Sequence, residues 1–117
     1  MEIKKMVVDG KCIDFVNDSI GTRNGFKHES TLFINGYEVI TAKVNYINRT
    51  WERYQYQTSM LRAVGDAIEV KLGELEDYYK YINGIKRFSK KTKEDFRAWA
   101  EFDDELKLLR AIAEKLK

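Results

Sequence analysis

Between residues 40 and 46 the hydrophobic positions repeat every second residue, the period of a β-strand with one buried and one solvated side. Residues 30–34 and 37–44 are rich in β-branched and aromatic side chains, and Asn35-Gly36 separates them. Such a pair tolerates the positive φ angles of a type I′ turn. The pattern predicts a β-hairpin. Its second arm has alternating apolar positions at Ile40, Ala42, Val44 and Tyr46.

A second hairpin is predicted around Asp9-Gly10, with residues 3–8 and 11–16 as its strands. An alternative is that residues 12–20 begin a short helix. Residues 17–28 are polar and rich in Gly and Asn, with another turn pair at Asn24-Gly25, so we expect a surface loop or an irregular hairpin there.

From about residue 51 to residue 82 the hydrophobic period changes to 3.6, which predicts a long amphipathic helix. Its apolar stripe comprises Tyr54, Leu61, Val64, Ile68, Leu72, Leu75, Tyr79 and Ile82. Asn48 or Thr50 can cap the start, and Asn83-Gly84 supplies the left-handed residue that ends many helices. A break near Gly73 is compatible with the low helix propensity of glycine.

A last helical pattern runs from Lys93 to the end of the chain, with a capping arrangement at Thr92 and Asp95. Its stripe comprises Phe96, Trp99, Phe102, Leu106, Leu109, Ala113 and Leu116. The chain has no proline, repeat or low-complexity segment, so we expect one domain over residues 1–117. The predicted class is α+β: an antiparallel sheet of hairpins in the N-terminal half, covered by the long helix and a C-terminal helix.

Composition indicates the cellular compartment in which this domain is expected. With 117 residues and 44% hydrophobic content the chain can form one core without disulfides or a metal. The lone Cys12 cannot form an intramolecular disulfide, which favours a reducing compartment, and we expect it to be a small core residue. The N-terminal apolar run is too short for a signal peptide, and no apolar stretch approaches the length of a membrane span. We therefore expect a cytoplasmic protein with no membrane partner.

Candidate catalytic groups are few. The only histidine, His28, lies in the predicted loop, and no spacing supports a dyad between it and Cys12. Carboxylates cluster at residues 74–77 and 103–105, where a solvated surface is the simplest interpretation. Residues 21–25 lack the Lys-Ser/Thr ending of a phosphate-binding loop. We expect no enzymatic activity, metal or cofactor.

Charge is uneven although the net charge is only +2. Residues 78–93 contain no acidic residue and carry six cations: Lys80, Lys86, Arg87, Lys90, Lys91 and Lys93. The segment also contains Tyr78, Tyr79, Tyr81 and Phe88. Cations neutralise phosphates and aromatic rings stack on exposed bases, so the composition suits nucleic acid or an acidic protein surface. A solvated connection after a helix C-terminus, where lysines favourably meet the dipole, is the competing interpretation.

A second candidate surface surrounds the start of the long helix. Arg49, Arg53 and Tyr56 are of the residue types that dominate binding hot spots and are free to face a partner. Trp51 and Tyr54 are better explained as structural residues.

Residues 32–36 and 44–57 together resemble a pattern in small uncharacterised proteins from phages and mobile elements of low-GC Gram-positive bacteria. The resemblance covers roughly residues 30–62 and carries no catalytic residue to this chain. It implies a phage setting, in which small proteins often act by occupying a host or defence protein, anti-CRISPR proteins among them.

Three hypotheses follow. The first is a non-enzymatic, phage-encoded inhibitor that binds a host defence or nucleic-acid-handling protein through its basic and aromatic residues. The alternative is a small direct nucleic-acid-binding protein or regulator that uses the same lysines on phosphates. The third is an oligomerising protein, a homodimer for example, whose long helix pairs with a copy of itself.

Overall fold

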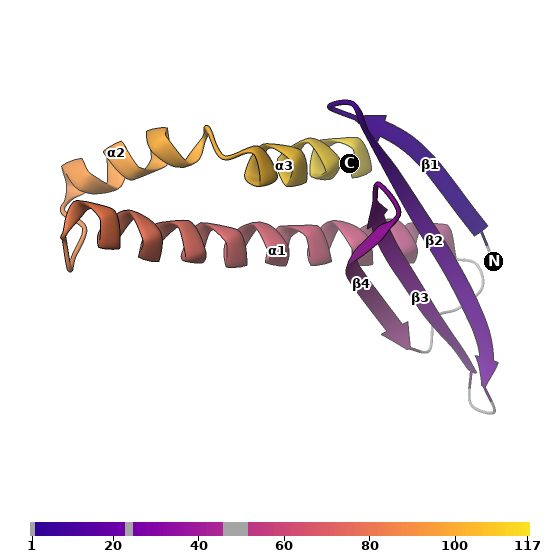
Figure 1. The fold of residues 1–117 in the computed structure, drawn as a ribbon. Coiled ribbons are helices and arrows are strands. Elements are labelled where there is room, and N and C mark those ends of the chain that lie inside the picture. The colour runs from indigo at the N-terminus through magenta and orange to yellow at the C-terminus, as the bar shows by residue number, and fades with distance from the viewer. Residues whose placement is uncertain (1, 23–24, 46–51) are drawn as a thin grey trace.

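The computed structural model describes residues 2–22, 25–45 and 52–117 and has the predicted α+β architecture (Figure 1). Four strands come first: β1 (Glu2–Val8), β2 (Lys11–Thr22), β3 (Gly25–Ile34) and β4 (Tyr37–Asn45). Three helices follow: α1 (Glu52–Asn83), α2 (Lys90–Ala100) and α3 (Asp104–Leu116). No helix of the described ranges is long and apolar enough to cross a membrane.

The strands form one antiparallel sheet in the order β1-β2-β3-β4. Asp9-Gly10 and Asn35-Gly36 all have positive φ, as type I′ turns require, so both predicted hairpins are confirmed. The alternative helix over residues 12–20 is wrong, because β2 pairs with a strand on each side. Of the two alternatives for residues 17–28, the loop is wrong and the hairpin is confirmed, since antiparallel pairing of β2 with β3 continues to Thr22 and Gly25; residues 23–24 lie outside the described part.

Alternation along the strands divides the sheet into a covered and an open face. Ile13 and Phe15 of β2, Leu32 of β3 and Ala42 of β4 are buried beneath the helices. Cys12 precedes Ile13 and therefore faces the other way, where it is exposed, so its prediction as a core residue is wrong. The one buried polar side chain among the described residues, Ser30, donates a hydrogen bond of 2.6 Å to Asn17 Oδ1.

The long helix is confirmed as α1, and it is continuous. The break that the glycine would permit near Gly73 does not occur, because Leu72 and Leu75 on either side pack into the core while Gly73 faces open space. Gly84 ends the helix with a φ of +63°. The capping positions Asn48 and Thr50 lie outside the described residues.

The C-terminal pattern forms two helices, so the prediction of a single helix from Lys93 is wrong. Asp103 interrupts it: its Oδ1 accepts the amide hydrogen of Leu106 at 2.9 Å and caps α3. The first cap is Ser89, which accepts from the Thr92 amide, rather than Thr92 itself. Phe102 lies in the turn between the helices and is 78% exposed, in contrast to its predicted place on the buried stripe.

Two hydrophobic clusters hold the molecule together. The sheet core lies between the covered face of the sheet, the first half of α1 and α3; it consists of Val8, Ile13, Phe15, Leu32, Ala42, Met60, Val64, Leu108, Ile112 and Leu116. The arm core joins α1, α2 and the start of α3; it consists of Leu75, Phe96, Ala100 and Leu106, with Ile68, Leu72, Tyr79, Phe88 and Trp99 against them. We call residues 72–100 the arm. Figure 1 shows it projecting away from the sheet, in agreement with extents of 55 × 32 × 22 Å.

Candidate functional site

The far end of the arm is a tight connection between α1 and α2 whose backbone is held at both ends. The amide of Ile85 donates to the carbonyl oxygen of Lys80 at 3.0 Å, and that of Gly84 donates to Tyr81 at 3.4 Å. This pair of bonds is a Schellman motif, and the positive φ of Gly84 makes it accessible. On the other side Ser89 Oγ accepts from the Thr92 amide at 3.2 Å. We call residues 80–93 the tip.

An aromatic cluster lies directly under the tip. Tyr79 is its centre, with ring centroids 5.8 Å from Phe88, 5.6 Å from Phe96 and 5.2 Å from Trp99. Phe88 also packs on Phe96 at 5.3 Å. Of the aromatics interleaved with the basic residues, Tyr79 and Phe88 are therefore structural. Tyr78 is 56% exposed but stacks on Trp99 at 6.1 Å.

The exposed apolar side chains of the tip are Tyr81 and Ile82. Tyr81 is 84% exposed and Ile82 is 48% exposed. The sequence places Ile82 on the buried stripe of α1, but it lies beyond Tyr79, the last residue of α1 that packs into the arm core. Tyr81 falls off that stripe by its helical spacing, a signal that could have identified it as an exposed residue.

Five of the six predicted basic residues of the tip are exposed: Lys86, Arg87, Lys90, Lys91 and Lys93. None of the five forms an ion pair with an acidic residue of the described ranges. Lys80 differs, because its Nζ lies 3.3 Å from Glu76 Oε1 and 5.0 Å from the centroid of the Phe88 ring. The structure thus brings five free cations together at one end of the molecule and assigns Lys80 to the support of that end.

Three of these cations lie where a helix dipole disfavours them. Lys90, Lys91 and Lys93 are in the first turn of α2, which contains no acidic residue. The N-terminal end of a helix carries a partial positive charge, and an unfavourably placed charge there costs about 0.3–1 kcal/mol. The sequence places the same lysines after the C-terminus of the long helix, where the dipole favours them. This placement is wrong for Lys90 and Lys91, because α2 begins at Lys90 rather than at Lys93.

The second predicted surface is only partly within the described residues. Arg49 and Trp51 lie outside them. Arg53 and Tyr56 are placed as backbone positions in the first turns of α1. These two positions are at the opposite end of the 32-residue α1 from the tip, and the prediction for Arg49 falls outside the described residues.

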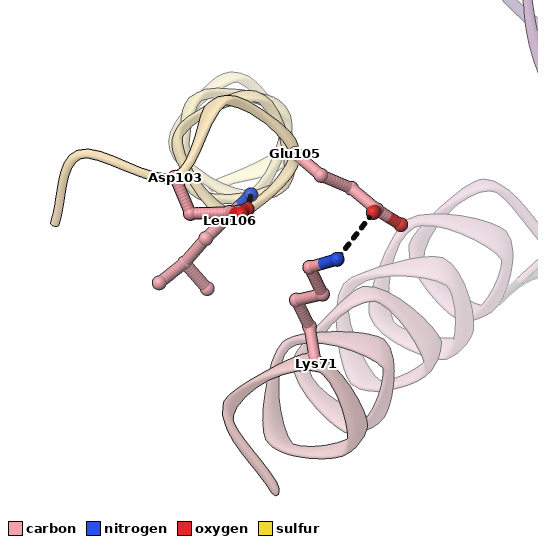
Figure 2. A network of polar contacts seen from close by, with 4 residues as sticks. All are labelled: Lys71, Asp103, Glu105 and Leu106. Carbon is pink, nitrogen blue, oxygen red and sulfur yellow. Dashed lines mark hydrogen bonds and ion pairs between the residues drawn. The ribbon is translucent and has the colours of Figure 1, made fainter. Parts of the chain in front are cut away.

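The predicted carboxylate cluster at residues 103–105 has structural roles, as Figure 2 shows. Asp103 caps α3, and Glu105 Oε2 lies 2.8 Å from Lys71 Nζ on α1. This hydrogen bond raises the pKa of Lys71 above the ordinary value for lysine, although burial opposes the shift. The ion pair joins α1 to α3 near the base of the arm.

The register of the sheet separates the other candidate groups. His28 lies in β3 opposite Ser19, not in a loop, and Cys12 is seven residues from Ser19 along β2. At about 3.3 Å per residue this separation is on the order of 23 Å, so the two do not form a dyad. Within the described ranges no three His, Cys, Asp or Glu side chains are grouped so that they could hold a metal ion.

No protein-family model, curated protein or solved structure matches the chain at a significant level. The resemblance of residues 30–62 to phage and mobile-element proteins therefore stays a prediction.

Proposed function

We propose that this chain is a non-enzymatic nucleic-acid-binding protein and that the tip is its contact surface. The observation that carries the proposal is the group of lysines in the first turn of α2, Lys90, Lys91 and Lys93, without an acidic residue in that turn. Their charges repel one another and the helix dipole, so the free protein bears an electrostatic cost at the tip. A bound polyanion removes this cost, because phosphates attract the lysines and are favoured at the positive end of a helix dipole.

The arrangement of the remaining charges supports the same function. Lys86 and Arg87 lie in the capped connection next to Ser89, so all five exposed cations belong to one end of the arm. Each phosphate contact contributes about 0.7 to the slope of log affinity against log salt on a single strand and about 0.9 on duplex DNA. Five contacts give a slope between about −3.5 and −4.5.

A second candidate function is the inhibitor of a host defence or nucleic-acid-handling protein. Tyr81 and Ile82 favour it, since exposed apolar side chains beside cations are typical of the centre of a protein interface. The phage resemblance supplies a setting for such an inhibitor. A protein partner held by apolar contacts predicts a much weaker salt dependence than the slope above, which separates the two functions.

Pairing of α1 with a second copy, the third hypothesis, gains no support. Most of the apolar stripe of α1 packs against the rest of its own chain: Leu61, Val64, Ile68, Leu72, Leu75 and Tyr79.

The experiment compares two triple charge reversals that change the net charge equally. The tip variant combines Lys86→Glu, Lys90→Glu and Lys91→Glu, and the control combines Lys5→Glu, Lys11→Glu and Lys43→Glu, all exposed residues of the sheet. Fluorescence anisotropy with labelled 20-nucleotide DNA, single-stranded and duplex, gives the affinities, and circular dichroism checks the fold.

We expect the tip variant to lose at least 10-fold in affinity at 100 mM salt and the control less than about 3-fold, because only the first set contacts phosphates. Equal losses in the two variants, or no binding by the wild-type protein, would contradict the proposal.

A further inference from the structure

We infer that the tip binds unpaired nucleotides and that Tyr81 stacks on one of their bases; this inference rests on the proposed function. Tyr81 is 84% exposed on the last turn of α1, at the same end of the arm as the free cations of the tip. The other aromatic residues of residues 78–93 are already in ring contacts: Tyr78 with Trp99, and Tyr79 with Phe88. Among the described residues of this segment, Tyr81 is the aromatic ring with both faces available to a ligand.

The shape of the tip disfavours reading of a duplex. It is formed by two helices side by side, α1 and α2, joined by a short connection (Figure 1). Two packed helices with axes 8–10 Å apart are roughly 20 Å across, whereas the major groove of B-DNA is about 12 Å wide. With its two helices set across the groove, the end of the arm is therefore too wide to enter. A duplex offers it phosphates but no base.

An unpaired strand offers both partners that the tip requires. Its phosphates meet the cations of the α2 first turn, and its bases present faces that are already covered in a duplex. The ring of Tyr81 stacks on such a face, and Ile82, 48% exposed beside it, loses contact with water in the same step. Ring stacking on a base does not depend on its identity, so the inference includes little sequence preference.

The test measures affinity for three probes of equal length: a 20-nucleotide poly-dT strand, an abasic strand with the same phosphates, and a 20-base-pair duplex. The protein variants are Tyr81→Ala, Tyr81→Phe and, as a matched control, Phe102→Ala. Phe102 is likewise an exposed aromatic residue, at 78%, but lies in the turn between α2 and α3.

We expect Tyr81→Ala to weaken binding of the poly-dT strand by about 5- to 150-fold, the range measured when one stacking residue is removed. Tyr81→Phe retains the ring face and binds within about 3-fold of the wild type, as does Phe102→Ala. On the abasic strand and the duplex, Tyr81→Ala has no effect beyond about 2-fold, since no base stacks on the ring there.

Equal affinity of the wild-type protein for poly-dT and the abasic strand would overturn the stacking inference and leave the proposed function standing. So would an unchanged poly-dT affinity of Tyr81→Ala. Failure of the proposed function is a different result, in which the wild-type protein binds none of the three probes or binds them independently of the tip cations.

Discussion

Replacing Phe96 by alanine tests whether the arm core holds the arm independently of the sheet core. Phe96 is 6% exposed and lies 5.6 Å from Tyr79, 5.3 Å from Phe88 and 6.2 Å from Trp99 between ring centroids. Truncating a buried phenylalanine costs about 3–5 kcal/mol in unfolding free energy. Domains of this size are stable by only about 5–15 kcal/mol, so the loss is a large fraction of the total.

Phe102→Ala is the matched control, because residues 96 and 102 lie on one stripe by sequence spacing but Phe102 is 78% exposed. We expect it to change the unfolding free energy by less than about 0.5 kcal/mol. Thermal unfolding followed by circular dichroism distinguishes the two variants, since a loss of about 1 kcal/mol lowers the midpoint of unfolding by roughly 4 °C for a chain of this length.

Hydrogen exchange shows where the stability is lost. In Phe96→Ala we expect amides of residues 75–100 to lose protection while those of residues 13–15 and 30–34 in the sheet keep most of theirs, because local openings follow separately packed units. Equal effects of Phe96→Ala and Phe102→Ala on stability would refute the assignment of Phe96 to the core. A uniform loss of protection across arm and sheet would refute two separable clusters.

Further substitutions test two helix ends, at Gly84 and Asp103, and the ion pair of Lys71. Gly84→Ala should lower the unfolding free energy by about 1–2 kcal/mol in a urea titration, because the φ of Gly84 is +63° and alanine is strained there. Gly73→Ala should raise it by about 0.5–1 kcal/mol, because alanine favours a helix over glycine. At both positions no atom crowds the added carbon. Asp103→Ala should cost about 1 kcal/mol of unfolding free energy by removing the cap of α3, and Asp103→Asn should restore most of it. Lys71→Met should cost up to about 1 kcal/mol at pH 7. The hydrogen bond to Glu105 raises the pKa of Lys71 in the folded protein, so the stabilisation is complete below the ordinary lysine pKa of about 10.5. It is lost as the pH rises through the pKa of Lys71 in the folded protein. The difference in stability between Lys71→Met and the wild type should therefore shrink in that pH range.

Turn chemistry and periodicity suffice for most of the fold. Asp9-Gly10 and Asn35-Gly36 tolerate the positive φ that a type I′ turn requires and thereby locate both hairpins, and the 3.6-residue stripe ending at Asn83-Gly84 locates α1. Cys12 is different, since a small apolar residue fits either face of a strand. Its position is decided by Ile13, whose larger side chain faces the core.

The break between α2 and α3 is missed for a physical reason. Trp99 and Leu106 keep a helical spacing across the turn, so the apolar pattern alone continues through it. The signal for a new helix is the capping residue Asp103 followed by two acids in the first turn, a pattern also compatible with solvated carboxylates.

The sequence predicts which charged residues form the candidate site, but not their positions relative to the helix dipole. The cations of residues 80–93 are evident in the sequence, whereas the start of α2 depends on whether Ser89 or Thr92 is the cap, and both residue types are good caps. With Thr92 as the cap, Lys90 and Lys91 would lie in the connection; with Ser89 as the cap, they lie in the first turn of α2. Burial of Tyr79 and exposure of Tyr81 follow from the packing of α2 on α1.

The most direct test of the central claim, that the tip is the nucleic-acid contact, is an NMR titration of isotope-labelled protein with a single-stranded 20-nucleotide DNA. Each backbone amide reports its own surroundings, so the contact surface is mapped without a mutation. We predict that chemical-shift changes concentrate in residues 80–93, with the sheet unaffected, and that they diminish as salt is raised. Changes centred on the sheet or on the first turns of α1, or no changes at low salt, would contradict the claim.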